Sequence, residues 1–496
     1  MRSERNKGGP PPVDPALMTS SNRPLPSDVP RERNPIQVIS VLLLACVSFA
    51  LAQTLVIPAL PAIAAELDAS TSATSWVLTG FLLSASVATP IIGKLGDLYG
   101  RGRVLTIVLV LFAAGGVIDA LAPTIEVLIA GRVLQGVAAG VFPLAFGIVR
   151  DTSPRHKVPG HLAALSAVFG IGGGIGLPLS GVLVDHADIS WLFWINLVAL
   201  PAAAAAHFLI PSAPSERRPR IDWAGAALLS GSLASLLLGV THAEAWGWTS
   251  PRTLGLLIGG VVLALVWIQV EARMPEPLIE LSVLRERAVA ATNATATLIG
   301  IAMFSSFLLI PQFAQTPEST GFGFGFSVTQ AGLLLVPSAL VQILVGPVAG
   351  RLGVRIGFRR VLALGTLLCA VSFGLLAVAH ASPWEFVVAG VVLGAGICFA
   401  FASMANLVVA ASPPAQVGIA TGINTVMRTV GGAFGSAIST AILAAHLVGR
   451  TGLPSEGAYT VAFVFSAVVA LAATGAALMV PQHVEERAPE PAAATT

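Results

Sequence analysis

The chain has 496 residues, of which 55% are hydrophobic and 10% are charged, and its formal net charge is +2. Soluble domains carry roughly 25% charged residues, so this chain lacks the charge that a water-exposed surface needs. The composition therefore excludes an ordinary soluble enzyme and indicates a membrane protein. The three cysteines, Cys46, Cys369 and Cys398, lie in apolar runs and give no disulfide or metal framework.

Residues 1–35 are rich in Pro, Ser and Arg and have no apolar segment before a cleavage site. They predict a disordered cytoplasmic tail rather than a secretory signal. From Ile36 to Val480 apolar runs recur, each near the ~20 residues that cross a bilayer as a helix. We predict an all-α polytopic membrane protein with about fourteen transmembrane helices, at 36–60, 73–94, 103–122, 125–148, 161–184, 189–210, 222–241, 253–270, 289–312, 328–350, 361–380, 385–410, 418–446 and 458–480.

The distribution of Lys and Arg tests this order of spans. With a cytoplasmic N-terminus, Arg252 and Arg450 fall outside, Arg132 and Arg428 fall within spans, and every other Lys and Arg is cytoplasmic. Because cytoplasmic loops are enriched in Lys and Arg, we expect a multi-pass protein of the cell (inner) membrane with both termini in the cytoplasm.

Two predicted cytoplasmic loops resemble each other, one after the second span and one after the tenth. The first contains Gly93, Asp97, Gly100, Arg101 and Arg103, and the second contains Gly350, Arg355 and Gly357 at similar spacing. This spacing indicates an internal repeat. We expect the glycines to allow a tight turn, and we expect Asp97 to pair with Arg101 or Arg103 at the membrane surface.

The first loop resembles the signature of the major facilitator superfamily, and the chain is most similar to its fourteen-span drug:proton antiporters. The segment Arg132-Val-Leu-Gln135-Gly136 in the fourth span is a second resemblance. The third is the fifth-span stretch with Gly172, Gly176, Pro178 and Gly181, which resembles the glycine motif of exporters. The likeness covers about residues 36–480 and implies a major facilitator fold.

Two positions depart from this family pattern. The first span usually carries an aspartate where this chain has Ala52. In the fifth span, Leu177 separates glycine from proline and Ser180 replaces a glycine. The first departure removes an expected proton-coupling acid, and the second alters a site of helix packing.

The resemblance implies a secondary active exporter of small amphipathic compounds that works by alternating access in exchange for protons. The implied organisation is a tail (1–35), a six-helix bundle (36–210), two extra helices with a cytoplasmic loop (211–288), a second six-helix bundle (289–480) and a tail (481–496). The family arginine, here Arg132, is implicated in proton transfer. Asp119 is the deepest acid, about a turn from the outer end of the third span, and is either a second coupling candidate or an interfacial cap.

Polar residues within spans are candidates for a substrate cavity or for bonds between helices. The cavity candidates are Gln53, Asn196, Asn293, Gln312, Gln342, Asn424 and Arg428. No span centre carries Asp or Glu, so a cavity with this balance is expected to disfavour dications and to accept neutral, zwitterionic or anionic amphipaths.

Other functions remain as alternatives at this point. An importer or uniporter of a small metabolite would share the fold, although the exporter-like fifth span argues against it. A lipid-modifying membrane enzyme would need clustered His, Asp or Glu at one membrane face, and the eight histidines are scattered. No phosphate-binding loop is present, so no ATP hydrolysis is expected. We expect no cofactor, no metal and no nucleic acid partner, a small-molecule substrate, protons as the coupling ion, the lipid bilayer as surroundings, and a monomer.

Overall fold

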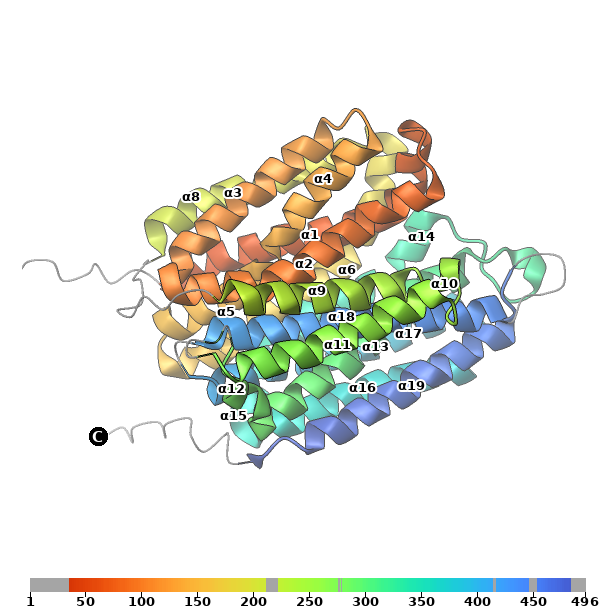
Figure 1. The fold of residues 1–496 in the computed structure, drawn as a ribbon. Coiled ribbons are helices and arrows are strands. Elements are labelled where there is room, and N and C mark those ends of the chain that lie inside the picture. The colour runs from red at the N-terminus through yellow and green to blue at the C-terminus, as the bar shows by residue number, and fades with distance from the viewer. Residues whose placement is uncertain are drawn as a thin grey trace, which may run out of the picture. The chain divides into compact units, whose positions relative to one another are not determined.

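The computed structural model describes residues 35–210, 222–274, 277, 279–413, 416–445 and 453–482, all within the compact unit Pro35–Thr496. The predicted tails and the loop arginines Arg217, Arg218 and Arg220 lie almost entirely outside these residues. Figure 1 shows long helices that run side by side through the described part. Thirteen of its helical segments are long and apolar enough to cross a membrane. The remaining expected span, 161–184, falls on the 29-residue helix α6 (Val158–His186), so the prediction of an all-α fold with about fourteen transmembrane helices is confirmed.

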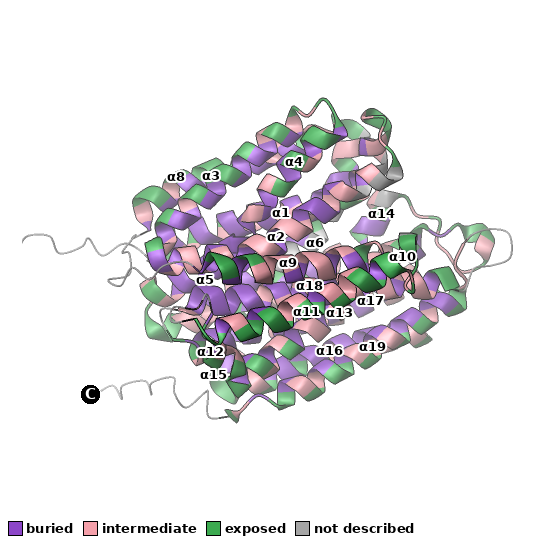
Figure 2. Ribbon diagram, viewed as in Figure 1, coloured by how far each residue is buried: buried purple, intermediate pink, exposed green. Residues whose placement is uncertain are grey.

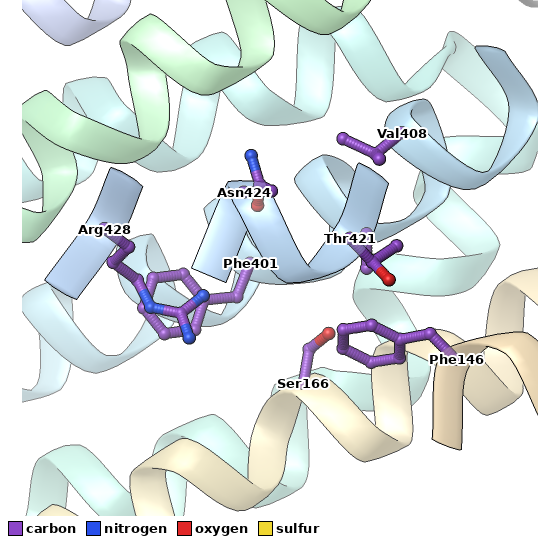
Figure 3. A pocket seen from close by; sticks show the side chains of 8 residues that line it. Phe146, Ser166, Phe401, Val408, Thr421, Asn424 and Arg428 are labelled. Carbon is purple, nitrogen blue, oxygen red and sulfur yellow. The ribbon is translucent and has the colours of Figure 1, made fainter. Parts of the chain in front are cut away.

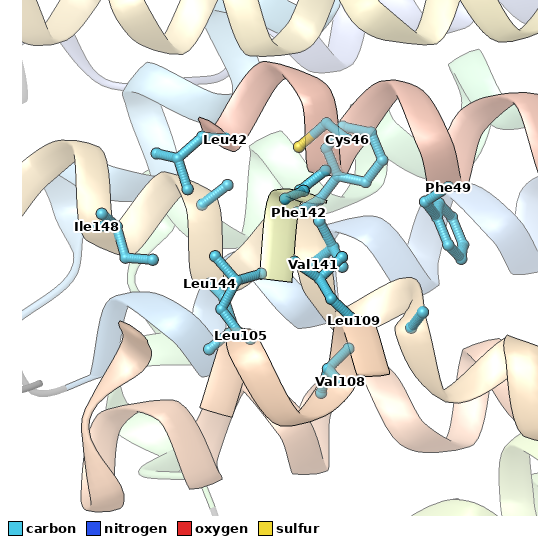
Figure 4. Packing of buried hydrophobic residues seen from close by; sticks show 14 of the residues in the cluster. Leu42, Cys46, Phe49, Leu105, Val108, Leu109, Val141, Phe142, Leu144 and Ile148 are labelled. Carbon is cyan, nitrogen blue, oxygen red and sulfur yellow. The ribbon is translucent and has the colours of Figure 1, made fainter. Parts of the chain in front are cut away.

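The helices of the first half pack mainly on one another, and we call them the N-terminal bundle. Its members are α1 (Pro35–Glu66), α2 (Thr71–Tyr99), α3 (Arg101–Ala120), α4 (Ile125–Gly136), η2 (Val137–Gly140), α5 (Val141–Thr152), α6 (Val158–His186), α7 (Trp191–Trp194), η4 (Ile195–Val198) and α8 (Ala199–Leu209). Its core contains Phe49, whose ring stacks on Phe81 at 5.6 Å and meets Phe142 edge-on at 6.1 Å. Figure 4 shows other members of this buried cluster, among them Cys46 and Leu109.

The fourth span is not one continuous α-helix, because α4 and α5 are joined by the short 3-10 turn η2. Glycine on both sides of this turn lets α2 come close. A Cβ at Gly136 would lie 2.5 Å from the Phe81 carbonyl oxygen, and one at Gly140 would lie 2.2 Å from Ile92. Small residues at such contacts are how helices pack tightly in lipid, where burial of apolar surface gives no driving force.

The helices of the second half form the C-terminal bundle. Its members are α13 (Arg287–Gln315), α14 (Val328–Leu333), α15 (Val336–Ile356), α16 (Phe358–Val378), α17 (Pro383–Ala411), α18 (Val417–Ala445) and α19 (Glu456–Leu478). The bundles meet along two seams, α2 against α18 and α6 against α15.

Between the halves of the chain lie α9 (Trp223–Thr241), α10 (Ala243–Trp246), α11 (Pro251–Glu271) and α12 (Leu281–Arg285). Helix α9 packs on both α2 and α18, where Ala226 joins Ile419 and Ile423 in one apolar cluster. Helix α11 packs on α9, and its other face is exposed, as at Ile258 and Leu265 (Figure 2). Helix α9 therefore covers the α2–α18 seam, and α11 lies on the outside of α9.

Several connections between helices gather at one end of the bundles, which we call the basic end. Lys94 at the end of α2 donates to the Pro277 carbonyl at 3.3 Å, and Arg359 at the start of α16 donates to the Leu478 carbonyl. Within the described ranges, Arg132 and Arg428 lie inside spans, Arg252 begins the helix at the opposite end, and the remaining Lys and Arg belong to connections at the basic end.

Candidate functional site

An ion-pair network forms at the turn between α2 and α3. The Asp97 side chain is only 2% exposed, and its Oδ1 accepts from Arg101 Nε and Nη2 at 3.0 and 2.7 Å. Arg101 also donates to Asp151, at the end of α5. Gly100 makes the turn with a φ of 93°, which side chains disfavour. The structure thus selects Arg101 as the partner, while Arg103 is exposed.

The same turn holds the N-terminal bundle against the first turn of α18. A Cβ at Gly93 would lie 2.5 Å from the Gly418 carbonyl oxygen, so the two backbones touch. A Cβ at Gly418 would lie 2.9 and 3.0 Å from the Asp97 oxygens. The carboxylate therefore faces the positive end of the α18 dipole, which stabilises negative charge. Nearby, Arg150 Nη1 donates to the Ser412 carbonyl at 2.9 Å, a second link between the bundles.

The second loop makes a corresponding contact at the α6–α15 seam. A Cβ at Gly350 would lie 3.0 Å from Gly160 Cα, and Gly357 ends α15 with the same φ of 93°. The position that matches Asp97 is Val354, which is exposed, and Arg355 is exposed as well. The repeat thus places a backbone contact at both seams but an acid at only one.

We expect Gly418→Ala to reduce transport strongly, because the added methyl would lie 2.7 Å from the Gly93 carbonyl oxygen and force the seam apart. Overpacking of this kind costs roughly 1–3 kcal/mol. Gly160→Ala is the matched control at the other seam, since a Cβ there meets no atom within 4 Å. Transport by the two variants, normalised to protein in the membrane, checks this prediction. Equal activity of both would show that the α2–α18 contact is not required.

A buried polar cluster lies inside the N-terminal bundle, between α3, α4 and η4. Asp119 is 3% exposed and lies over Gly131, where a Cβ would be 2.1 Å from its Oδ1. One turn earlier, a Cβ at Gly116 would be 2.9 Å from Asn196 Cβ and 3.4 Å from Gln135 Nε2. Glycines on α3 and α4 therefore make the room that these polar side chains occupy.

Arg132 is the cation of this cluster and, like Gln135, is fully buried. It donates to the Val77 and Ala52 carbonyl oxygens, each at 3.3 Å, and to Gln135 Oε1 at 2.6 Å. The guanidinium also lies 4.2 Å from the centre of the Phe81 ring, a cation–π distance. At Ala52, where the family pattern has an acid, this chain offers Arg132 a backbone carbonyl instead.

A small pocket lined by both apolar and polar side chains lies between the two bundles and is seen in Figure 3. Side chains of α5 and α6 face side chains of α17 and α18 across it. Its lining residues are Phe146, Ser166, Phe401, Ala405, Val408, Thr421, Asn424 and Arg428.

The chemistry of this central pocket is set by α18. Arg428 is the charged residue in the described lining, and its guanidinium lies 4.5 Å from the centre of the Phe401 ring. Asn424 donates to Asn293 Oδ1 at 3.0 Å, which brings a third predicted cavity residue beside the pocket. The lining thus combines an aromatic face, a cation and an amide group around a space of about 10 Å³, which is close to what one water molecule needs.

The other predicted cavity residues lie elsewhere. Asn196 belongs to the cluster around Arg132. Gln53 is half-buried on α1, and Gln312 is exposed on α13. Gln342 is buried on α15, where its carbonyl accepts from Cys398 Sγ at 3.3 Å. Among the described residues, these four are not part of the central pocket's lining.

The glycine-rich stretch of α6 packs on α1. Thr54 Oγ1 donates to the Gly172 carbonyl at 2.6 Å, and a Cβ at Gly176 would lie 2.0 Å from the same hydroxyl. Pro178 is buried inside the helix. Gly181 faces the other bundle, where a Cβ would lie 2.5 Å from the Thr329 hydroxyl.

Sequence reasoning assigned no role of their own to three of these groups. Gln135 lies three residues after Arg132, a spacing that puts both on one helix face, so it was detectable. Asp151 follows Arg150 at a span end and could have been proposed as a partner for the basic loop. The contact of Phe401 with Arg428 joins two helices and has no local signal.

About fourteen membrane-spanning helices in two halves, with a repeated loop at the seams and a small pocket between them, define a polytopic membrane transporter. The chain belongs to the Major Facilitator Superfamily, whose family model matches residues 42–322 and 293–495. It is therefore a transporter and not an enzyme.

The relatives include one named export protein and one named multidrug resistance protein. The tetracenomycin C resistance and export protein of Streptomyces glaucescens is 30% identical over 379 residues, covering 75% of this chain and 69% of that protein. Multidrug resistance protein 3 of Bacillus subtilis is 28% identical over 352 residues, covering 70% and 66%. An uncharacterized MFS-type transporter of Mycobacterium tuberculosis is 30% identical over 396 residues, covering 77% of this chain but only 56% of its own length.

A solved structure shares the fold. The human organic anion transporter MFSD10 (TETRAN) superposes with a TM-score of 0.64 at 18% identity, covering 89% of this chain and 99% of that one.

Proposed function

We propose that the protein is a secondary active exporter of small amphipathic compounds, driven by proton exchange. The observation that carries this proposal is the central pocket between two bundles whose seams are in contact at the basic end. The bundles would move as units about this pocket by alternating access. Separation of Gly93 from Gly418 and of Gly350 from Gly160 would open the pocket toward the basic end.

The direction of transport is supported by similarity to the tetracenomycin C exporter and to multidrug resistance protein 3. The proposed orientation places the basic end and both termini in the cytoplasm, in accord with the enrichment of Lys and Arg in cytoplasmic loops. The protein would work as a monomer in the cell's inner membrane.

Proton exchange is proposed to use Arg132 and Asp119. Charged groups inside a membrane protein are costly and are retained mostly for function. Arg132 is fixed by three oxygen acceptors, and Asp119 is the acid whose charge acts on it across the cluster. The absence of an acid at position 52 leaves Asp119 as the coupling acid nearest to this arginine in the described N-terminal bundle.

The test is an efflux panel of matched neutral, anionic, monocationic and dicationic amphipaths, in cells with and without the protein. Arg428 places positive charge at the pocket, and like charges 4 Å apart repel by roughly 4 kcal/mol at an effective dielectric constant of about 20. We therefore expect neutral and anionic compounds to be exported and dications to be excluded. Arg428→Gln should admit cations and lose the anions.

An uncoupler should abolish export by the wild type if protons drive it. If cells with the protein and cells without it retain every compound equally, the proposed function itself is contradicted. Preferred export of dications by the wild type would contradict only the role of Arg428.

A further inference from the structure

A second pocket lies at the end of the N-terminal bundle opposite the basic end. It forms where α1 and α3 end and where α4 and α7 begin, and its lining includes Glu66, Asp119, Ser190 and Phe193. It has no lining residue in common with the central pocket, which is built from α5, α6, α17 and α18. The two pockets are therefore separate.

Asp119 is the deepest polar group of this second pocket. It is 97% buried, being 3% exposed, and among the described residues neither of its oxygens has a hydrogen-bond partner. Its position depends on Gly131, because any side chain there would collide with Oδ1. A carboxylate buried without donors is unstable unless it is protonated or its charge is balanced. Asp119 is such a group, and it lies at the second pocket, at the end of the bundle opposite the basic end.

Further buried polar groups lie between Asp119 and Arg132. Asn196 and Gln135 both lie beside Gly116, one turn before Asp119 on α3, and Gln135 accepts from Arg132. Within the described residues, both amide atoms of Asn196, Gln135 Nε2 and Arg132 Nη2 have no partner. Buried polar atoms are nearly always satisfied, so an unsatisfied set of this kind points to a functional demand.

The charges that face Asp119 favour a proton over a metal ion. Arg132 approaches from α4, and Glu66 at the end of α1 is the exposed acid of the pocket. Helix α7 and η4 contribute Ser190 and Asn196, which are neutral. A guanidinium repels metal cations, and one buried carboxylate does not supply the several oxygen ligands that hard cations require.

Given the proton-driven export proposed above, on which this step rests, we infer that Asp119 binds the exchanged proton through the second pocket. The exported compound would bind at the central pocket, so proton and substrate would use separate sites. One proton passes from water at the end opposite the basic end to an Asp119 oxygen, which converts the carboxylate to a carboxylic acid. After the bundles have moved, the same O–H bond breaks and the proton passes to water on the side of the basic end, which restores the carboxylate. Arg132 keeps its hydrogen bonds to the two carbonyl groups and to Gln135 whether Asp119 is ionised or protonated. Protonation removes only the negative charge of Asp119 that balances the guanidinium.

A substrate-free test uses dicyclohexylcarbodiimide, an apolar reagent that modifies protonated carboxyl groups. In membranes containing the full chain, the peptide with Asp119 should be modified, and the modification should fall about tenfold per pH unit above the titration midpoint. Asp119→Asn should remove the modification. No modification of Asp119, or modification that does not change with pH, would overturn the inference.

A transport test separates this inference from the proposed function. For a compound that the panel shows to be exported, Asp119→Asn should abolish accumulation driven by a pH gradient but retain exchange of labelled for unlabelled compound. Glu126→Gln is the matched control and should behave like the wild type. Glu126 is an exposed acid at the start of α4, at the same end of the N-terminal bundle as Asp119. If the pH gradient does not change transport by the wild type, the proposal of proton coupling is contradicted. If the wild type uses the gradient and Asp119→Asn does so equally well, only the role of Asp119 fails.

Discussion

Replacing Asp97 by alanine should abolish export while leaving the protein in the membrane. Arg101 would keep Asp151 but lose its buried partner, and the first turn of α18 would lose the carboxylate that faces it. Hydrogen bonds to charged groups contribute about 1.5–3 kcal/mol. The balance between closed and open arrangements of the basic end should therefore shift by roughly 10- to 150-fold.

Export rates normalised to protein abundance measure this effect. The matched control is Val354→Ala, because Val354 holds the same position in the second loop but is exposed. The control should retain wild-type rates. Full export by Asp97→Ala would show that the carboxylate is not needed for export and that the first loop serves only to set the membrane topology.

Arg132→Lys should lose export almost as completely as Arg132→Ala. The guanidinium bonds Val77, Ala52 and Gln135 in three directions while its flat face covers Phe81. A lysine ammonium has one charged atom and cannot reproduce this fork. Removing one partner from a buried charged network costs about 3–5 kcal/mol.

Arg103→Lys is the control for loss of a guanidinium, since Arg103 is exposed in the loop. Because Arg132→Ala could unfold the bundle, elution and thermal stability of the solubilised protein should be measured beside export. Wild-type export by Arg132→Lys would rule out a need for the guanidinium geometry.

The spans, and the position of Arg132 inside one of them, could be predicted because hydropathy encodes them. Which side chains of a span are buried inside a bundle could not be predicted. In a bilayer both the lipid face and the interior of a bundle are apolar, so helical periodicity does not separate them. Asn196 and Asn424 therefore look alike in sequence, yet one joins the cluster around Arg132 and the other faces the central pocket.

Local spacing indicated the pairing of Asp97 with Arg101, but partners that are distant along the chain were beyond sequence reasoning, because only the tertiary fold brings them together. Gly93 and Gly418 touch although more than 300 residues separate them along the chain. The carbonyl of Ala52 binds Arg132, and a backbone acceptor is independent of residue type. The missing acid at position 52 was visible in the sequence, but its replacement by a main-chain oxygen was not.

The repeated loop has a mechanical consequence, because its two copies are not equivalent. At the α2–α18 seam the touching backbones are reinforced by Asp97, whereas at the α6–α15 seam Val354 contributes no charge. In the proposed cycle the two seams at the basic end therefore differ in the free energy needed to separate them. The α6–α15 seam would separate first, because no ion pair reinforces it. The α2–α18 seam would set the free energy needed for full opening, so the Asp97 carboxylate would control a motion of both bundles.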